Sequence, residues 1–197
     1  MSLDLELAGD QTRRRGRNVA VLLFCALLLS TIVAVLTIPR FGFARLYRVP
    51  TEGMLPTLLP GDQLYATSLL YVAGKPKRGD IVVFTPPDDA VPGKEKEIVL
   101  FKRVAGLPGE KISIKSGRFY AQDRLVNELS NREYVIVKGD YLYQDGGETI
   151  VPDNAYFLLG DNSASSYDSR YWGAVPKKNI QGRVIFRYWP FSRIGLL

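Results

Sequence analysis

The stretch EIVLFKRV, residues 97–104, consists mainly of aliphatic and aromatic residues and carries Lys102 near its centre. Because successive side chains of a strand point to opposite faces, Lys102 shares a face with Leu100 and Val104, and Arg103 points the other way. A lysine with such neighbours lies either at a sheet edge, with its stem along apolar surface, or inside the protein for a purpose. Burial would lower the pKa of Lys102 and make its amine usable as a general base near neutral pH.

Similar short runs continue along the chain, and clusters of Gly, Pro, Asp and Asn separate them. The other expected strands are DIVVF (80–84), KISIK (111–115), RFYAQ (118–122), EYVIV (133–137), AYFLLG (155–160) and GRVIFRYW (182–189). KSGR (115–118) and DGG (145–147) predict tight turns, and PPDDAVPGKEKE (86–97) predicts an exposed loop. With no helical periodicity after residue 40, the sequence predicts a mainly β fold class with one all-β domain over residues 40–197.

An apolar run precedes this domain. Residues 19–38, VAVLLFCALLLSTIVAVLTI, contain no charged residue, and at ~1.5 Å rise per residue they match the ~30 Å hydrocarbon core of a bilayer. The alternatives are a buried helix or a cleavable signal peptide, but the run exceeds the about 7–15 residues of a signal-peptide core. RRRGR (13–17) favours a cytoplasmic N-terminus. We expect a cytoplasmic tail over 1–17, a single transmembrane helix over 18–39 and the β domain on the opposite side.

Composition excludes several kinds of site. The 197 residues include no histidine and one cysteine, Cys25, which lies within the apolar run. Ser-His-Asp and Cys-His catalysis, histidine metal sites and disulfides are therefore excluded, and we expect no cofactor or metal. The formal net charge is +6, but the basic residues are dispersed and form no recognised nucleic-acid-binding motif, so we expect no nucleic-acid partner.

Separate segments of the sequence resemble the motifs of type I signal peptidases, which are membrane-bound Ser/Lys endopeptidases. PTEGMLPTLLPGD (50–62) is similar to the family signature Pro-Ser-x-Ser-Met-x-Pro-Thr-Leu, and the order of the segments is that of the family. The remaining segments are RGDIVVF (78–84), FKRVAGLPGE (101–110) and LGDNSASSYDSRYWGAVP (159–176). YWPFSRIG (188–195) is similar to cyanobacterial and plastid members. The resemblance implies an all-β signal-peptidase-type domain behind a membrane anchor.

The resemblance also implies roles for individual residues. Lys102 falls on the general base, Thr51 on a hydroxyl of the oxyanion hole, and Ser166 on the serine that orients the base. Supporting residues are Asp161, Asp168 and Arg170, with Asp168 and Arg170 expected as an ion pair, and Met54, Pro56 and Leu58 shape the loop and its contact with membrane and substrate. In the family a serine attacks the peptide carbonyl while the lysine takes its proton. The implied substrates are exported preproteins, cleaved after Ala-x-Ala.

The implied location is a membrane that preproteins cross, with the β domain on the periplasmic, extracellular or thylakoid-lumen side. The lipid bilayer is therefore an expected partner. Apolar and aromatic residues with either a lipid-contacting or a core role are Leu69, Leu70, Tyr71, Tyr188, Trp189 and Phe191.

Gly53 occupies the position of the nucleophilic serine. Because glycine has no side-chain oxygen, we predict that cleavage is lost or strongly impaired; loss of one catalytic member costs on the order of 10⁶ in rate in subtilisin. Three hypotheses follow. In the first, the chain is an inactive homologue that binds precursors or membrane protein partners. In the second, the glycine is a substitution in an otherwise active peptidase, and in the third, an unusual mechanism such as a Lys102-activated water retains activity.

Overall fold

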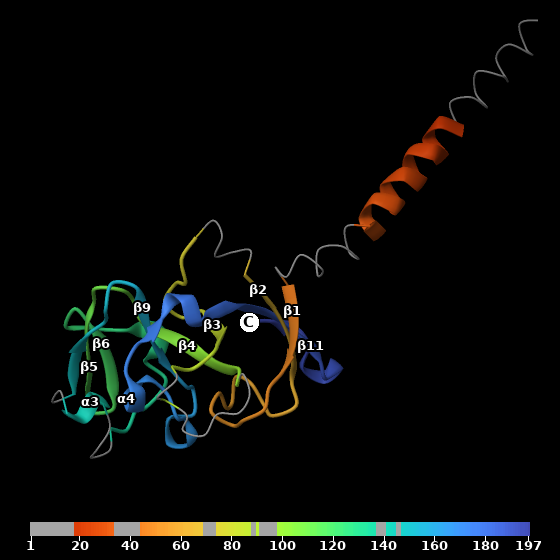
Figure 1. Cartoon of the computed structure of the whole chain (residues 1–197). Helices are drawn as coiled ribbons and strands as arrows, with labels where there is room; N and C mark the ends of the chain where they lie inside the picture. The colour runs from red at the N-terminus through yellow and green to blue at the C-terminus, as the bar shows by residue number, and fades with distance from the viewer. Residues whose placement is uncertain are drawn as a thin grey trace, which may run out of the picture. The chain divides into compact units, whose positions relative to one another are not determined.

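The computed structural model describes residues 18–33, 44–68, 74–87, 90, 98–136, 141–144 and 147–197. The chain divides into two units, Met1–Phe43 and Ala44–Leu197. In the first unit, residues 18–33 form a helix whose side chains are all exposed (Figure 1). None of the helices within these described ranges is long and apolar enough to cross a membrane. The expected tail over 1–17 and residues 34–39 of the expected anchor lie outside the described residues.

The second unit contains a large antiparallel sheet, and the strand that carries Lys102 lies within it rather than at an edge (Figure 1). In spatial order its strands are β1 (Ala44–Arg48), β2 (Gln63–Thr67), β11 (Ile180–Trp189), β3 (Ile81–Phe84), β4 (Leu100–Gly106), β9 (Ala155–Leu159) and β10 (Val175–Pro176). A short strand, β12 (Gly195–Leu196), also pairs with β11. Strands β3 and β9 are buried along their whole length, which agrees with their nearly continuous apolar sequence.

A second, smaller sheet follows β4 in the sequence. Its strands are β7 (Arg124–Leu125), β6 (Arg118–Ala121), β5 (Lys111–Lys115) and β8 (Glu148–Ile150), in that spatial order. Ser116 and Gly117 join β5 to β6 with φ values of 48° and 75°, as a two-residue hairpin turn of this handedness requires. Short helices in the loops are η2 (Asn127–Leu129), α3 (Tyr141–Gln144), η3 (Ser163–Ser165), α4 (Ser169–Trp172), η4 (Lys177–Asn179) and η5 (Phe191–Arg193).

One local prediction is wrong. Residues 133–136 of the expected strand EYVIV do not form a strand, although Tyr134 is buried and Val135 is exposed as alternation demands. Their backbone groups bond outside any ladder: the Tyr134 amide donates to Gly117 O (2.8 Å), and the Val135 amide donates to Ser163 Oγ (3.1 Å). The turn predicted at DGG lies mostly outside the described residues: only Gly147 of that segment is described, with a φ of 83°, and helix α3 precedes the segment. Most of the expected loop over 86–97 also lies outside the described residues.

The mainly β prediction is confirmed, and the buried residues form three clusters around the sheets. Alternate residues of β3 lie in different clusters, because the large sheet is covered on both faces. The cluster that includes the expected nucleophile loop consists of Val49, Met54, Leu58, Leu64, Ala66, Ile81, Val83, Phe101 and Val184. Val82, Phe84, Val104, Tyr156, Leu158 and Val175 form the second cluster. The third lies by the small sheet and includes Ile112, Phe119, Leu129 and Phe157.

Candidate active site

Lys102 is buried, with 3% of its surface exposed. It stands opposite Val82 on β3, and β4 is flanked by β3 and β9, so the sheet-edge alternative does not hold. Desolvation lowers the pKa of the Lys102 ammonium below its ordinary value. The negative charge of Asp168 opposes this effect, and the positive charge of Arg170 adds to it. Lys102 is thus a buried amine that gives up its proton more readily than a surface lysine.

Gly53 faces the Lys102 amine. A Cβ on Gly53 would lie 2.7 Å from Lys102 Nζ and 3.6 Å from both Ser165 O and Ser166 Cα. The loop backbone here is held by Asn162, whose amide donates to Gly53 O (3.1 Å) and whose Nδ2 donates to Glu52 O (3.2 Å). The space for a side chain at residue 53 is therefore bounded by the lysine amine and the loop that carries Ser166.

Ser166 is buried and tied to Asp168. Its hydroxyl donates to Asp168 Oδ2 at 2.7 Å, and the same oxygen accepts the Gly160 amide at 2.9 Å. A hydroxyl has one proton to donate and two lone pairs. Because the proton is directed to Asp168, the Ser166 oxygen has its lone pairs left to accept a hydrogen bond.

Asp168 and Arg170 form a buried ion pair. Arg170 Nε lies 2.9 Å from Asp168 Oδ1, and the two side chains are 1% and 0% exposed. The Arg170 guanidinium also donates to the backbone carbonyls of Val135 (2.7 Å), Ser163 (2.8 Å) and Ser166 (3.1 Å). One arginine therefore fixes the loop around Ser166 and the segment that was expected to be a strand.

Asp161 forms a second charged centre. It accepts hydrogen bonds from Arg103 Nη2 (2.6 Å), Arg132 Nη2 (3.0 Å) and Thr57 Oγ1 (2.5 Å). Burial raises the pKa of the Asp161 carboxyl, but the hydrogen bonds and charge of Arg103 outweigh it with help from Thr57 and Arg132, so the pKa is lowered overall. Asp161 thereby connects the expected nucleophile loop to Arg103, the neighbour of Lys102 on β4.

The remaining expected residues divide by exposure. Met54 and Leu58 are buried in the cluster beneath the loop and anchor it there, so they do not face membrane or substrate. Thr51 and Pro56 are exposed on the same loop. Lys102 and Ser166 thus lie beside Gly53, and Thr51 is separated from Gly53 in the sequence by Glu52.

Sequence reasoning missed four residues of this arrangement, which are Arg103, Thr57, Asn162 and Gly160. A Cβ on Gly160 would overlap Ser166 Oγ and Gly53 O, so only glycine allows the two loops to approach this closely. Gly160 and Asn162 lie within the LGDN motif, which was a signal for both. Thr57 falls on the threonine of the family signature matched by PTEGMLPTLLPGD, which was a signal for it.

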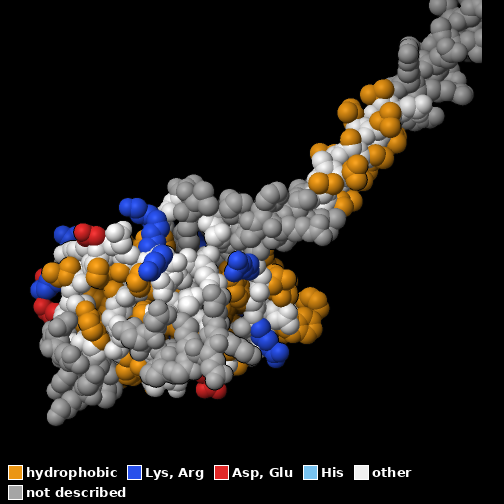
Figure 2. All heavy atoms as spheres, viewed as in Figure 1, with side chains coloured by type: hydrophobic (Ala, Val, Ile, Leu, Met, Phe, Trp, Pro, Cys, Tyr) orange, Lys and Arg blue, Asp and Glu red, His pale blue; other side chains and the backbone are white. Residues whose placement is uncertain are grey.

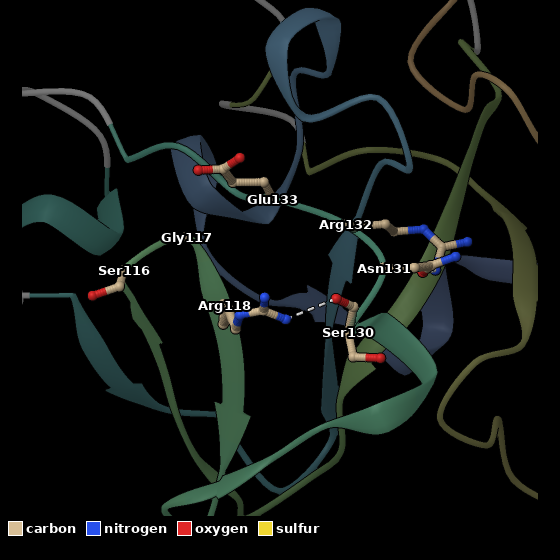
Figure 3. A pocket seen from close by; sticks show the side chains of 7 residues that line it. All are labelled: Ser116, Gly117, Arg118, Ser130, Asn131, Arg132 and Glu133. Carbon is tan, nitrogen blue, oxygen red and sulfur yellow. Dashed lines mark hydrogen bonds between the residues drawn. The ribbon is translucent and has the colours of Figure 1, made fainter.

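A pocket of about 330 Å³ lies elsewhere on the domain (Figure 3). Its arginines are engaged by the protein itself: Arg118 Nη1 donates to Ser130 O (3.0 Å), and Arg132 Nη1 donates to Asn131 Oδ1 (2.7 Å). None of the expected site residues lines it. Within the described part of the chain, no three acidic, cysteine or histidine side chains gather where they could hold a metal ion.

Comparison with known proteins agrees with this geometry. Residues 20–189 match the family "Signal peptidase, peptidase S26". "Probable signal peptidase I-2" of Synechocystis sp. is 39% identical over 149 residues, which are 76% of this chain and 65% of that protein. "Signal peptidase I" of Bacillus caldolyticus is 37% identical over 171 residues, 83% of this chain and 89% of that protein.

A plant protein is also similar. "Probable thylakoidal processing peptidase 2, chloroplastic" of Arabidopsis thaliana is 35% identical over 166 residues, 84% of this chain and 43% of that protein. The matching proteins thus include one from a cyanobacterium, one from a Bacillus and one from a plant chloroplast. Since the family match extends over most of the sequence, this chain belongs to the signal peptidase family, peptidase S26.

Proposed function

We propose that this chain has the substrate-cleaving site of a signal peptidase I without its nucleophile, so that cleavage of preproteins after Ala-x-Ala is lost or strongly impaired. The observation that carries this proposal is the place of Gly53. Its absent side chain would stand 2.7 Å from the amine of the buried Lys102, while Ser166, Asp168 and Arg170 are joined in one bonded group. Glycine supplies no oxygen to attack a carbonyl.

With a serine at residue 53, each group has a task. The serine Oγ forms a bond to the scissile carbonyl carbon while Lys102 Nζ accepts its proton, and the lysine then returns that proton to the leaving amine. Ser166 orients the lysine, and the backbone amide of residue 53 and the Thr51 hydroxyl stabilise the oxyanion. Water activated by the same lysine then hydrolyses the acyl-enzyme. The buried environment supports this role for Lys102, because it lowers the pKa of the amine.

The test is cleavage of a model preprotein by the purified full chain, by Gly53→Ser and by Gly53→Ser combined with Lys102→Met. Gly53→Ala is the matched control, because it adds the same Cβ without an oxygen. We expect cleavage only with Gly53→Ser, and none when the Ala-x-Ala site of the preprotein carries bulky residues. Normal processing by the unchanged chain would contradict the proposed loss, and an inert Gly53→Ser chain would contradict the proposed site.

A second candidate is an inactive homologue that binds precursors or a membrane protein partner. The intact bonds around Asp168 and Asp161 favour it, because they keep the Gly53 region ordered without a nucleophile. We expect the unchanged chain to retain an intact preprotein on an affinity resin. A preprotein with a disrupted Ala-x-Ala site is the control, and equal retention of the two would contradict specific binding.

The proposed location is a membrane, with a single anchor over residues 18–39, a cytoplasmic N-terminus and the β domain on the trans side. The uncharged run over 19–38 supports an anchor, and the relative from Arabidopsis is named as thylakoidal. Hydrophobic side chains reach the surface of the β domain as well (Figure 2). Among them, Trp189 is 44% and Phe191 is 72% exposed, which supports contact with lipid. Leu69, Leu70 and Tyr71 lie outside the described residues.

A further inference from the structure

The segment that carries Gly53 connects β1 to β2, and we call residues 49–62 the Gly53 loop. Its two ends are joined by the backbone bonds Val49 N to Asp62 O and Gly61 N to Val49 O, both 2.9 Å. Met54 and Leu58 hold its middle in the core. These contacts leave the carbonyls of Pro56 and Thr57 to be satisfied from elsewhere.

Arginines far away in the sequence satisfy them. Arg187 Nη1 donates to Thr57 O at 2.9 Å, and Arg193 Nη2 donates to Thr57 O at 3.2 Å and to Pro56 O at 3.4 Å. Arg187 Nε also donates to Arg193 O at 2.5 Å, which joins the two arginines through the backbone of residue 193. Arginine side chains of the C-terminal segment, residues 187–197, therefore contact the main-chain carbonyls of the Gly53 loop.

A buried carboxylate fixes these arginines in place. Asp62 is 2% exposed, and Arg193 Nη1 lies 2.9 Å from both of its oxygens. Arg187 Nη1 lies 3.3 Å from Asp62 Oδ2, which also accepts the Leu59 amide at 2.9 Å. Charge-assisted bonds to a desolvated carboxylate are among the stronger contacts in proteins, and losing one partner leaves a buried charge uncompensated.

Thr57 contacts both the arginines of the C-terminal segment and Asp161 of the candidate site. Its carbonyl is held by Arg187 and Arg193, while its hydroxyl donates to Asp161. The residue after Asp161 is Asn162, whose amide bonds to Gly53 O. A shift of the loop at Thr57 would thus move the backbone at residue 53 relative to the Lys102 amine.

We infer that Arg187 and Arg193 are positioning residues: they fix the Gly53 loop so that residue 53 faces Lys102. This inference rests on the proposed function for the meaning of the site, but the contacts can be tested without cleavage. The C-terminal segment, and not only the β4 strand and the loop after β9, then determines the geometry of the nucleophile position.

The primary test is amide hydrogen exchange of the full chain, comparing peptides from residues 54–62 with peptides from β5. For Arg193→Leu we expect exchange of the loop amides to rise by about tenfold while β5 stays unchanged, because charge-assisted bonds to buried groups restrain local opening. Arg193→Lys should recover part of the protection, since a lysine keeps the charge beside Asp62. Arg124→Leu, an exposed arginine of β7, is the matched control and should change neither region.

Unchanged loop exchange in Arg193→Leu would overturn the inference. Equal acceleration in β5 would also overturn it, since Arg193 would then only stabilise the whole domain. If the leucine variant does not fold, Arg193→Gln serves instead, because glutamine keeps a donor for the carbonyls without the charge.

A second experiment measures the cleavage kinetics of Gly53→Ser with and without Arg193→Leu. With cleavage restored, Arg193→Leu should lower kcat by about tenfold with a smaller effect on KM, because misplacing a reacting group affects the chemical step. If Gly53→Ser is inert while loop exchange responds to Arg193, the proposed function fails and the positioning role stands. If Gly53→Ser cleaves and Arg193→Leu changes neither kcat nor exchange, the positioning role is wrong.

Discussion

Lys102 Nζ lies 2.7 Å from the point that a Cβ of residue 53 would occupy, so the amine lies in space that a side chain at Gly53 would share. The obstructing atom is the free end of a long, flexible side chain, and not backbone. The next nearest atoms, Ser165 O and Ser166 Cα, are at ordinary contact distance, 3.6 Å. A side chain at residue 53 thus meets one movable neighbour.

This arrangement predicts that Gly53→Ser and Gly53→Ala both fold. A small displacement of the Lys102 amine accommodates the new Cβ, so we expect each to change the free energy of unfolding by no more than about 1 kcal/mol. Urea denaturation of the two variants beside the unchanged chain measures this. Unfolding of the alanine variant at much lower urea would mean that the amine cannot move.

Stability should depend on pH through Lys102. The pKa of Lys102 is lowered in the folded protein from its ordinary value of 10.5, mainly by desolvation. Between the folded and unfolded pKa values the unfolded chain binds a proton that the folded chain does not, so the free energy of unfolding rises with pH across that window. The cost of burying Lys102 is therefore largest below the folded pKa and disappears above 10.5.

Lys102→Met removes this cost. We expect it to be more stable than the unchanged chain at about pH 6, with the difference shrinking toward about pH 10. Denaturation midpoints across this range give the measurement, and Lys178→Met, at an exposed position, is the control that should show no such trend. A difference that grows with pH would contradict the lowered pKa.

Gly160→Ala should disturb the site directly. The new Cβ would overlap Ser166 Oγ and the Gly53 carbonyl oxygen, and an overlap with backbone is relieved only by moving a loop. We expect a loss of about 1–3 kcal/mol in the free energy of unfolding and loss of any activity that Gly53→Ser confers. Gly195→Ala, where nothing lies within 4 Å of the new atom, is the control; equal effects of the two would refute the steric argument.

Asp168→Asn should be strongly destabilising. It leaves the guanidinium of Arg170, 1% exposed, without its carboxylate, and breaking a buried pair costs about 3–5 kcal/mol. Thermal or urea unfolding of the full chain measures the loss. Combining Asp168→Asn with Arg170→Met should recover part of it; a double variant as unstable as the sum of the single ones would show that the two residues act independently.

The strands of the large sheet could be predicted where the sequence is nearly continuously apolar, as in β3 and β9. Such short apolar runs are typical of strands that are buried on both faces. EYVIV failed although its alternation is real: Tyr134 is buried and Val135 is exposed. Periodicity reports which side chains face inward, but it does not report whether a neighbouring strand is present to accept the backbone bonds. Here a turn carbonyl, Ser163 and Arg170 take them.

The burial of Lys102 was left open by the sequence, because the pattern of a single strand does not state whether that strand is central or at an edge. The contacts of Asp62 and Asp161 were not predicted at all. Arg193 and Asp62 are separated by 131 residues, and no local pattern identifies a partner at such a distance. Motif resemblance assigned roles to residues within the matched segments, but it assigned none to Arg187 of β11 or to Arg193 of η5, although Arg193 lies within YWPFSRIG (188–195).

The residues around Gly53 also determine what a single base change at its codon would do. Glycine codons that end in a pyrimidine differ from serine codons at one nucleotide, so a serine can arise at residue 53 by a single base change from such a codon. Because the loop is held by Asn162 through its main chain and by buried Met54 and Leu58, we expect that change to require only a shift of the Lys102 amine. From such a codon, one base change would supply the hydroxyl that the proposed mechanism requires at residue 53.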